Sequence, residues 1–196
     1  MGRIGCVLAR LPFGKGPPAD AGCVRGRLRP DLCPMQPHVT AAVLWALILG
    51  GAGGILTEIG PWYRNLRKPS WQPPDWLFGP AWTVILGLAA WAAVLSWDAA
   101  ANEAGRMTVI ALFAVNFVCH FLWSPLFFAR KRPDWALVEV VPLWLSVLAL
   151  CVMLREFSVL ASWLIVPYLA WVSFAACLNL AIVRLNRPFG DVREIS

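Results

Sequence analysis

Five long apolar runs constrain this chain more than any other feature. They cover residues 39–57, 78–97, 107–129, 135–154 and 159–183. A helix needs about 20 apolar residues to cross the roughly 30 Å hydrocarbon core of a bilayer. Open strand edges cannot lie in lipid, so runs of this length are expected to be helical. The sequence therefore predicts an all-α fold, a five-transmembrane-helix bundle that forms one domain over residues 39–187.

Composition argues against a soluble domain. Hydrophobic residues make up 59% of the chain and charged residues 14%, with a mean hydropathy of +0.64, well above the usual range for soluble domains. A net charge of +6 would suggest nucleic-acid binding in a soluble protein. In a membrane protein, loop charge sets the topology instead, so we expect no nucleic-acid partner. The six cysteines form no C-x-x-C pair, so neither a disulfide framework nor a zinc site is expected.

Residues 1–38 differ from the rest of the chain. They contain six arginine or lysine residues and six prolines without apolar periodicity, a composition that predicts a disordered extension. Without that extension, nine basic residues lie on the side of the 58–77 loop and two on the opposite side. This bias predicts that the loop and the C-terminus, with its short tail at 188–196, face the cytoplasm and that the N-terminus lies outside. With the extension the ratio is nine to eight, which suggests that translation starts at Met35 and that residues 1–34 are not translated.

The stretch 61–80, between the first two runs, combines prolines with aromatic side chains. Its five prolines exclude a continuous helix, while its three tryptophans, one tyrosine and one phenylalanine are too many for a solvated linker. Such a loop either anchors at the membrane interface or folds over a cavity mouth, and we expect it to do both. Near the end of the first run, Gly50, Gly51, Gly53 and Gly54 permit close helix approach or a loosened helix beside a ligand.

Four ordered motifs make the chain recognisable. They are W-Y-x-x-L-x-K-P-S-W-x-P-P-x-W at 62–76, G-P-A-W-T at 79–83, L-W-S-P-L-F-F at 122–128 and V-P-Y-L-A-W-x-x-F-A-x-x-L-N at 166–179. Together they resemble the TspO/MBR family, the tryptophan-rich sensory proteins and mitochondrial translocator proteins, over about residues 37–187. The resemblance implies a five-helix bundle, often a homodimer, whose pocket opens toward the cytoplasmic side beneath the first loop.

The same resemblance implies a ligand class. Family members bind tetrapyrroles such as protoporphyrin IX and haem, and animal members also bind cholesterol and drug-like ligands. Some bacterial members are reported to degrade protoporphyrin in light. We therefore expect a tetrapyrrole as ligand, with no cofactor required.

Several aromatic residues follow from the resemblance as ligand-binding candidates. The family's pocket tryptophans fall on Trp82 and Trp171, and Trp62 and Tyr63 would belong to the lid, while Phe174 lies in the same motif as Trp171. Trp82 and Trp171 could stack on a flat macrocycle, and they would be the catalytic residues if porphyrin degradation is real. The alternative for Trp171 is ordinary packing in an aromatic helix.

The third run places polar and aromatic residues on one helix face. Asn116, His120, Trp123 and Phe127 recur at i, i+4, i+7 and i+11. Polar groups inside a membrane normally face the bundle interior or a cavity. Asn116 is therefore expected to contact the ligand or to form an interhelical hydrogen bond, and Trp123 to contact the ligand, pack, or support the lid.

His120 is the main departure from the resemblance, because the family usually has Asn at this position. Imidazole is an axial haem ligand and titrates near neutral pH. His120 is thus a candidate haem-iron ligand or a pH-dependent gate for porphyrin. The alternative is a neutral histidine that is hydrogen-bonded to a neighbouring helix.

These observations favour a membrane protein that binds tetrapyrroles as a sensor, scavenger or carrier. The first alternative is a light-dependent porphyrin-degrading enzyme. The second is a sterol or lipid carrier, which is disfavoured because Leu178–Arg184 lacks the tyrosine of the proposed cholesterol pattern. No nucleophile–base pair, phosphate-binding glycine loop or metal-spaced cluster is found in the sequence, so hydrolysis and phosphoryl transfer are not expected.

Overall fold

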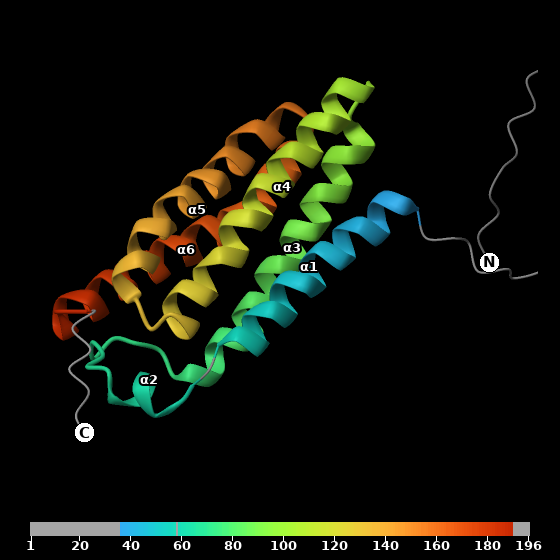
Figure 1. Ribbon diagram of the computed structural model, residues 1–196. Helices are drawn as coiled ribbons and strands as arrows, with labels where there is room; N and C mark the ends of the chain where they lie inside the picture. Colours follow the sequence, from blue (N-terminus) through green and yellow to red (C-terminus); the bar gives the residue numbers. More distant parts are fainter. Residues whose placement is uncertain (1–35, 58, 190–196) are drawn as a thin grey trace, which may run out of the picture. The chain divides into compact units, whose positions relative to one another are not determined.

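A computed structural model describes residues 36–57 and 59–189. It contains five long helices: α1 (Pro37–Leu56), α3 (Phe78–Ala99), α4 (Glu103–Ser124), α5 (Pro133–Met153) and α6 (Val159–Asn186). All five are long and apolar enough to cross a membrane, and the described part of the chain contains no strand. The predicted all-α bundle of five transmembrane helices is confirmed (Figure 1).

Four short elements join or extend the long helices. They are α2 (Pro61–Asn65), η1 (Asp75–Leu77), the π-helical turn η2 (Pro125–Ala129) and η3 (Leu154–Glu156). Proline at the first position starts α1, α2, η2 and α5, where its missing N–H and fixed φ cost nothing. The proline-rich 61–80 stretch therefore forms two short helical segments, joined by an irregular connection with a turn at residues 70–71, and ends in the start of α3.

Several helices extend beyond the ends of the predicted runs. The α4 helix begins at Glu103 because Asn102 Oδ1 accepts a 2.8 Å hydrogen bond from the Gly105 N–H. The fifth run continues to Asn186 as α6, three residues beyond its predicted end. Pro142 lies inside the fourth run, and α5 continues through it. A transmembrane helix tolerates such a proline when neighbouring groups compensate for the lost hydrogen bond.

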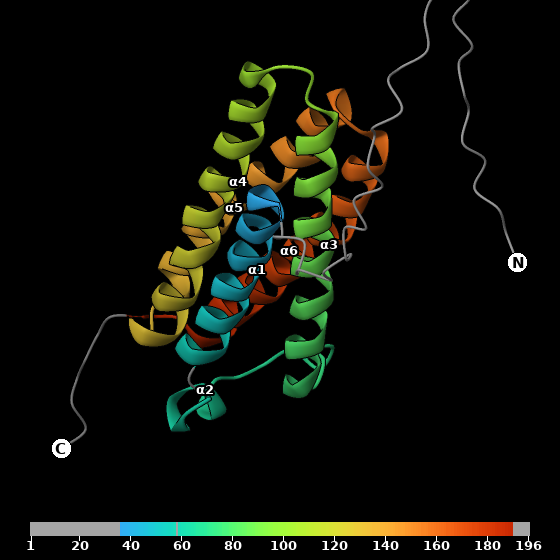
Figure 2. The same ribbon diagram turned by 90° about the vertical axis from the view of Figure 1, so that its right-hand side faces the viewer.

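The helices pack in the order α1, α3, α6, α5, α4, and α1 closes the ring by packing on both α3 and α4. Figure 2 shows α1 between α3 and α4, with α5 and α6 behind it. The most completely buried side chains come from α5 and α6, among them Val147, Leu150, Ile165 and Tyr168. The core therefore lies toward α5 and α6, while α1 is the least covered helix of the ring.

The two ends of this bundle are held differently. At one end, the Asn186 side chain accepts from the Arg67 N–H and donates to the Arg67 carbonyl, both at 2.8 Å, which ties the α2–η1 connection to the end of α6. This end also carries η2 and the start of α5 (Figure 1). At the other end, His38 Nε2 lies 3.0 Å from Asp98 Oδ1 and links the start of α1 to the end of α3.

Nine basic residues were assigned from the sequence to the side of the 58–77 loop. Eight of them lie at the end of the bundle that carries the α2–η1 connection: Arg64, Arg67, Lys68, Arg130, Lys131, Arg132, Arg184 and Arg187. That this end faces the cytoplasm stays a prediction from loop charge. The α1 helix begins at Pro37, two residues before the predicted domain boundary. The rest of the predicted 1–38 extension, the start at Met35 and most of the 188–196 tail lie outside the described residues.

Candidate functional site

A cavity of about 1030 Å³ lies among the helices. Its lining runs along α1 from Val39 to Gly54 and takes further side chains from α3, α4, η2, α5 and α6. Small-molecule sites are usually clefts of about 300–1,000 Å³ lined mainly by apolar and aromatic groups. By size and lining, this cavity suits a large hydrophobic ligand.

Glycines of α1 and α3 leave space along the lining of the cavity. A Cβ atom added at Gly51, Gly53, Gly54, Gly79 or Gly87 would meet no atom within 4 Å, and all five residues line the cavity. The α1 helix also stays helical through its glycines up to Leu56. Of the two roles predicted for the α1 glycines, close helix approach does not occur at Gly51, Gly53 or Gly54. They instead leave space next to an intact helix.

Aromatic rings gather around Trp82 of α3. Its ring centroid lies 4.7 Å from that of His120 and 6.2 Å from that of Trp171, with interplanar angles of 78° and 84°. The indole N–H groups of Trp171 and Trp123 are buried and have no hydrogen-bond partner among the described residues. Buried donors are normally paired, so these two indoles are exceptions among the described residues.

A chain of polar side chains lies behind this aromatic cluster and joins α4, α5 and α6. His120 Nδ1 lies 2.6 Å from the Tyr168 hydroxyl, which donates to Asn116 Oδ1 at 3.2 Å. Asn116 Nδ2 donates to Ser146 Oγ at 2.9 Å, and Ser146 donates to the Leu143 carbonyl at 2.7 Å. Asn116 and Tyr168 are fully buried, so their polar atoms depend on these contacts.

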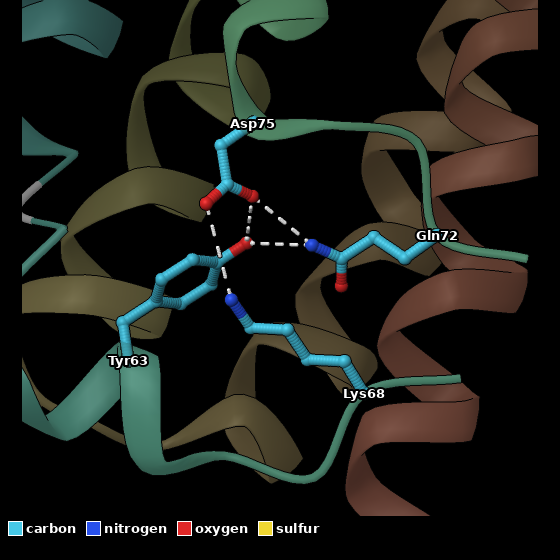
Figure 3. Close-up of polar contacts among 4 residues, drawn as sticks. All are labelled: Tyr63, Lys68, Gln72 and Asp75. Atoms are coloured by element: carbon cyan, nitrogen blue, oxygen red, sulfur yellow. Dashed lines mark hydrogen bonds and ion pairs between the residues drawn. The ribbon is translucent and has the colours of Figure 1, made fainter. Parts of the chain in front are cut away.

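The α2–η1 connection closes one end of the cavity with a polar cluster (Figure 3). The Tyr63 hydroxyl donates to Asp75 Oδ1 at 3.2 Å, and Gln72 Nε2 donates to both the Tyr63 hydroxyl and Asp75 Oδ1 at 3.2 and 3.1 Å. Lys68 Nζ lies 3.7 Å from the Tyr63 ring centroid and 4.0 Å from Asp75 Oδ2. Burial, with a smaller contribution from the Asp75 carboxylate, raises the pKa of Tyr63 to about 12, so the phenol stays neutral.

The family model that matches this chain is that of the TspO/MBR family, over residues 41–185. The chain belongs to the TspO/MBR family. With its five apolar helices it is a multi-pass integral membrane protein of that family.

Relatives of the same family come from distant organisms. Protein CrtK of Rhodobacter capsulatus is 39% identical over 153 residues, 78% of this chain and 95% of the relative. The tryptophan-rich protein TspO of Archaeoglobus fulgidus is 37% identical over 150 residues, 76% of this chain and 96% of the relative. The translocator protein of Sus scrofa is 35% identical over 159 residues, 78% of this chain and 94% of the relative. The similarity therefore covers nearly the whole length of these TspO/MBR proteins.

Five of the residues predicted as ligand-binding lie at the cavity of this TspO/MBR protein: Tyr63, Trp82, His120, Trp123 and Trp171. Three do not line it. Asn116 lies behind His120 in the polar chain. It forms interhelical hydrogen bonds there, which is the second of the two roles expected from the sequence. Trp62 packs edge-on against Phe127, and Phe174 lies between Trp71 and Trp171 with ring centroids 5.7 and 5.6 Å away.

Two groups of residues at the TspO/MBR site were not singled out from the sequence. Tyr168 and Ser146 contribute to the polar chain, and Lys68, Gln72 and Asp75 form the cluster at the loop. Tyr168 had a signal, because it lies three residues before Trp171 and hence on the same helix face. Ser146 had none, since a small hydroxyl residue in an apolar helix is common.

Proposed function

We propose that this TspO/MBR protein binds a tetrapyrrole, protoporphyrin IX or haem, in the cavity and acts as a sensor, scavenger or carrier. The observation that carries the proposal is the cavity of about 1030 Å³ with Trp82 and Trp171 in its lining. A flat, largely apolar macrocycle suits aromatic walls because rings stack or meet edge to face.

A further feature supports this ligand class. The cavity glycines leave open space where side chains would otherwise stand, which suits a broad ligand.

A dark titration of the purified full chain with protoporphyrin IX tests the proposal through tryptophan quenching and the Soret band. We expect saturable quenching in the wild type. In Trp171→Phe the affinity obtained from the titration should fall at least about tenfold, a loss of about 1.4 kcal/mol of binding free energy. Trp163→Phe is the matched control, because Trp163 lies on the same helix, is 67% exposed and does not line the cavity. Linear, unsaturable quenching would indicate partition into detergent and would overturn the proposal.

We also propose that the α2–η1 connection and the C-terminus face the cytoplasm, on the basis of the basic residues at that end of the bundle. Labelling of a cysteine introduced at Ser70, in a variant whose six native cysteines are replaced by serine, by a membrane-impermeant reagent in cells and in inverted vesicles tests this orientation. Labelling in inverted vesicles alone is expected, and labelling in intact cells alone would reverse it. The homodimer that the resemblance implies stays a prediction.

Light-dependent degradation of the bound porphyrin is the second candidate. The observation that favours it is the contact between Trp82 and Trp171, two oxidisable indoles that both line the cavity. Illumination of the porphyrin-loaded protein in the presence of oxygen separates the two functions. Loss of bound porphyrin that stops in Trp82→Phe or Trp171→Phe indicates an enzyme, whereas porphyrin that bleaches equally in all variants indicates a binder.

A further inference from the structure

The polar chain behind the cavity fixes the tautomer of His120. Ser146 uses its only hydrogen toward the Leu143 carbonyl and therefore accepts from Asn116 Nδ2. Asn116 Oδ1 then faces the Tyr168 hydroxyl and accepts its hydrogen. The Tyr168 oxygen has no second hydrogen to give, so across the 2.6 Å contact it accepts from His120 Nδ1–H. In this arrangement each of the four linked side chains, His120, Tyr168, Asn116 and Ser146, has a hydrogen-bond partner.

A neutral imidazole protonated at Nδ1 carries its free lone pair on Nε2. His120 lines the cavity, and its Nε2 has no hydrogen-bond partner among the described residues. Trp82 packs against the same ring at 4.7 Å and limits its rotation. The side chain is thus held from behind by Tyr168 and from the side by Trp82, with a metal-binding nitrogen left free.

We infer that His120 Nε2 is the axial ligand of an iron tetrapyrrole and that Tyr168, through its hydrogen bond to Nδ1, is a positioning residue for that ligand. The inference rests on the proposed function and sharpens it, because it assigns the cavity to the iron-bearing tetrapyrrole rather than to the metal-free one. Histidine ligands of metals typically donate their other N–H to a fixed acceptor, which sets the tautomer and raises ligand basicity. Tyr168 supplies that acceptor here.

The test compares hemin with metal-free protoporphyrin IX on the full chain and on His120→Ala. In wild type we expect an iron–imidazole stretching band in the resonance Raman spectrum of the reduced hemin complex. In His120→Ala the band should vanish and hemin affinity should fall at least about tenfold more than protoporphyrin IX affinity does. The matched control is His38→Ala. His38 is the chain's only other histidine and lies at the start of α1, where it contacts Asp98, so this variant should keep the band.

Tyr168→Phe tests the positioning role with the ring retained. Loss of the phenol oxygen removes the acceptor for Nδ1–H, so hemin affinity should fall by about 10-fold and the iron–imidazole band should shift in frequency. Protoporphyrin IX affinity should stay unchanged, which also reports that the variant folds. Free imidazole added to His120→Gly should restore the band, because it replaces the missing ligand in the same cavity.

The failures of this inference and of the proposed function are distinguishable. Saturable protoporphyrin IX binding together with an iron–imidazole band that persists in His120→Ala would overturn the axial ligand and leave the proposed function standing. Equal losses of hemin and protoporphyrin IX affinity in His120→Ala would show a packing role only and would also overturn it. No saturable binding of either tetrapyrrole would overturn both.

Discussion

Removal of one hydroxyl from the loop cluster should loosen the cover of the cavity without disturbing the bundle. In Tyr63→Phe the ring keeps its contacts with Phe127 and Phe128, at centroid distances of 6.5 and 5.6 Å. The cluster loses two hydrogen bonds, the one from Tyr63 to Asp75 and the one from Gln72 to Tyr63, both 3.2 Å long. The Asn186 contacts to the Arg67 backbone remain, so the loop stays tethered at α6.

The size of the effect follows from those two contacts. A net hydrogen bond contributes about 0.5–1.5 kcal/mol, and bonds at the long end of the usual distance range belong in the lower half of that interval. The free energy of loop opening should therefore fall by about 1–2 kcal/mol, which corresponds to a 5- to 30-fold larger open population. Amide hydrogen exchange of residues 60–77 should speed up by that factor, and bound protoporphyrin IX should dissociate faster.

The matched control is Tyr168→Phe, which removes the chain's only other tyrosine hydroxyl from a site buried in the bundle. Its loop exchange should equal that of wild type. Unchanged exchange at residues 60–77 in Tyr63→Phe would refute the idea that this cluster holds the loop closed. Faster exchange spread over all five long helices would refute it as well, since it would show a loss of global stability.

Three further predictions follow from the same geometry. Gly87→Leu should lower protoporphyrin IX affinity at least about tenfold, because the new side chain enters open cavity space. The control is Ala111→Leu, at an exposed position of α4 outside the cavity lining. Equal affinities of the two variants would contradict the cavity's role in binding. Asn116→Ala should lower the free energy of unfolding by about 1–2 kcal/mol, since it removes two interhelical hydrogen bonds; an unchanged melting temperature would argue against the polar chain. The pKa of Tyr63 is raised from 10.0 to about 12, so the native state holds its proton more tightly and loop closure should weaken as pH rises from 10 through 12. Protection factors of the loop amides, corrected for the pH dependence of intrinsic exchange, should fall over that range, and unchanged protection factors would contradict this.

Apolar length alone was enough to predict the five helices. The cost of unpaired backbone groups in lipid leaves helix as the available structure for such runs, and the ends moved by only a few residues, with the Asn102 cap at the start of α4 as one cause. The inward face of α4 and η2 was also predictable, because Asn116, His120, Trp123 and Phe127 share it by spacing. Of these four, Asn116 alone lies behind the cavity rather than at its wall.

The partners across that face could not be predicted. Periodicity gives the face of each helix, but the contact between Asn116 and Ser146 depends on the axial offset between α4 and α5, which no single helix encodes. Tyr168 likewise reaches His120 from a position 48 residues away in the sequence. The sequence therefore singled out His120 and missed its hydrogen-bond partner Tyr168, because such partners come from packing between helices.

The surroundings of the α1 glycines favour a ligand-binding role that the sequence alone could not distinguish from close helix packing. In transmembrane helices glycine usually lets a neighbouring backbone approach, and the lost side chain is compensated by close packing. At Gly51, Gly53 and Gly54 nothing approaches within 4 Å of a built Cβ, so this compensation is missing, although glycine costs about 1 kcal/mol relative to alanine in a helix. All three positions line one cavity together with Trp82 and Trp171. A ligand that fills the cavity, as proposed above, would supply the contacts that offset these glycines, so its binding should stabilise α1.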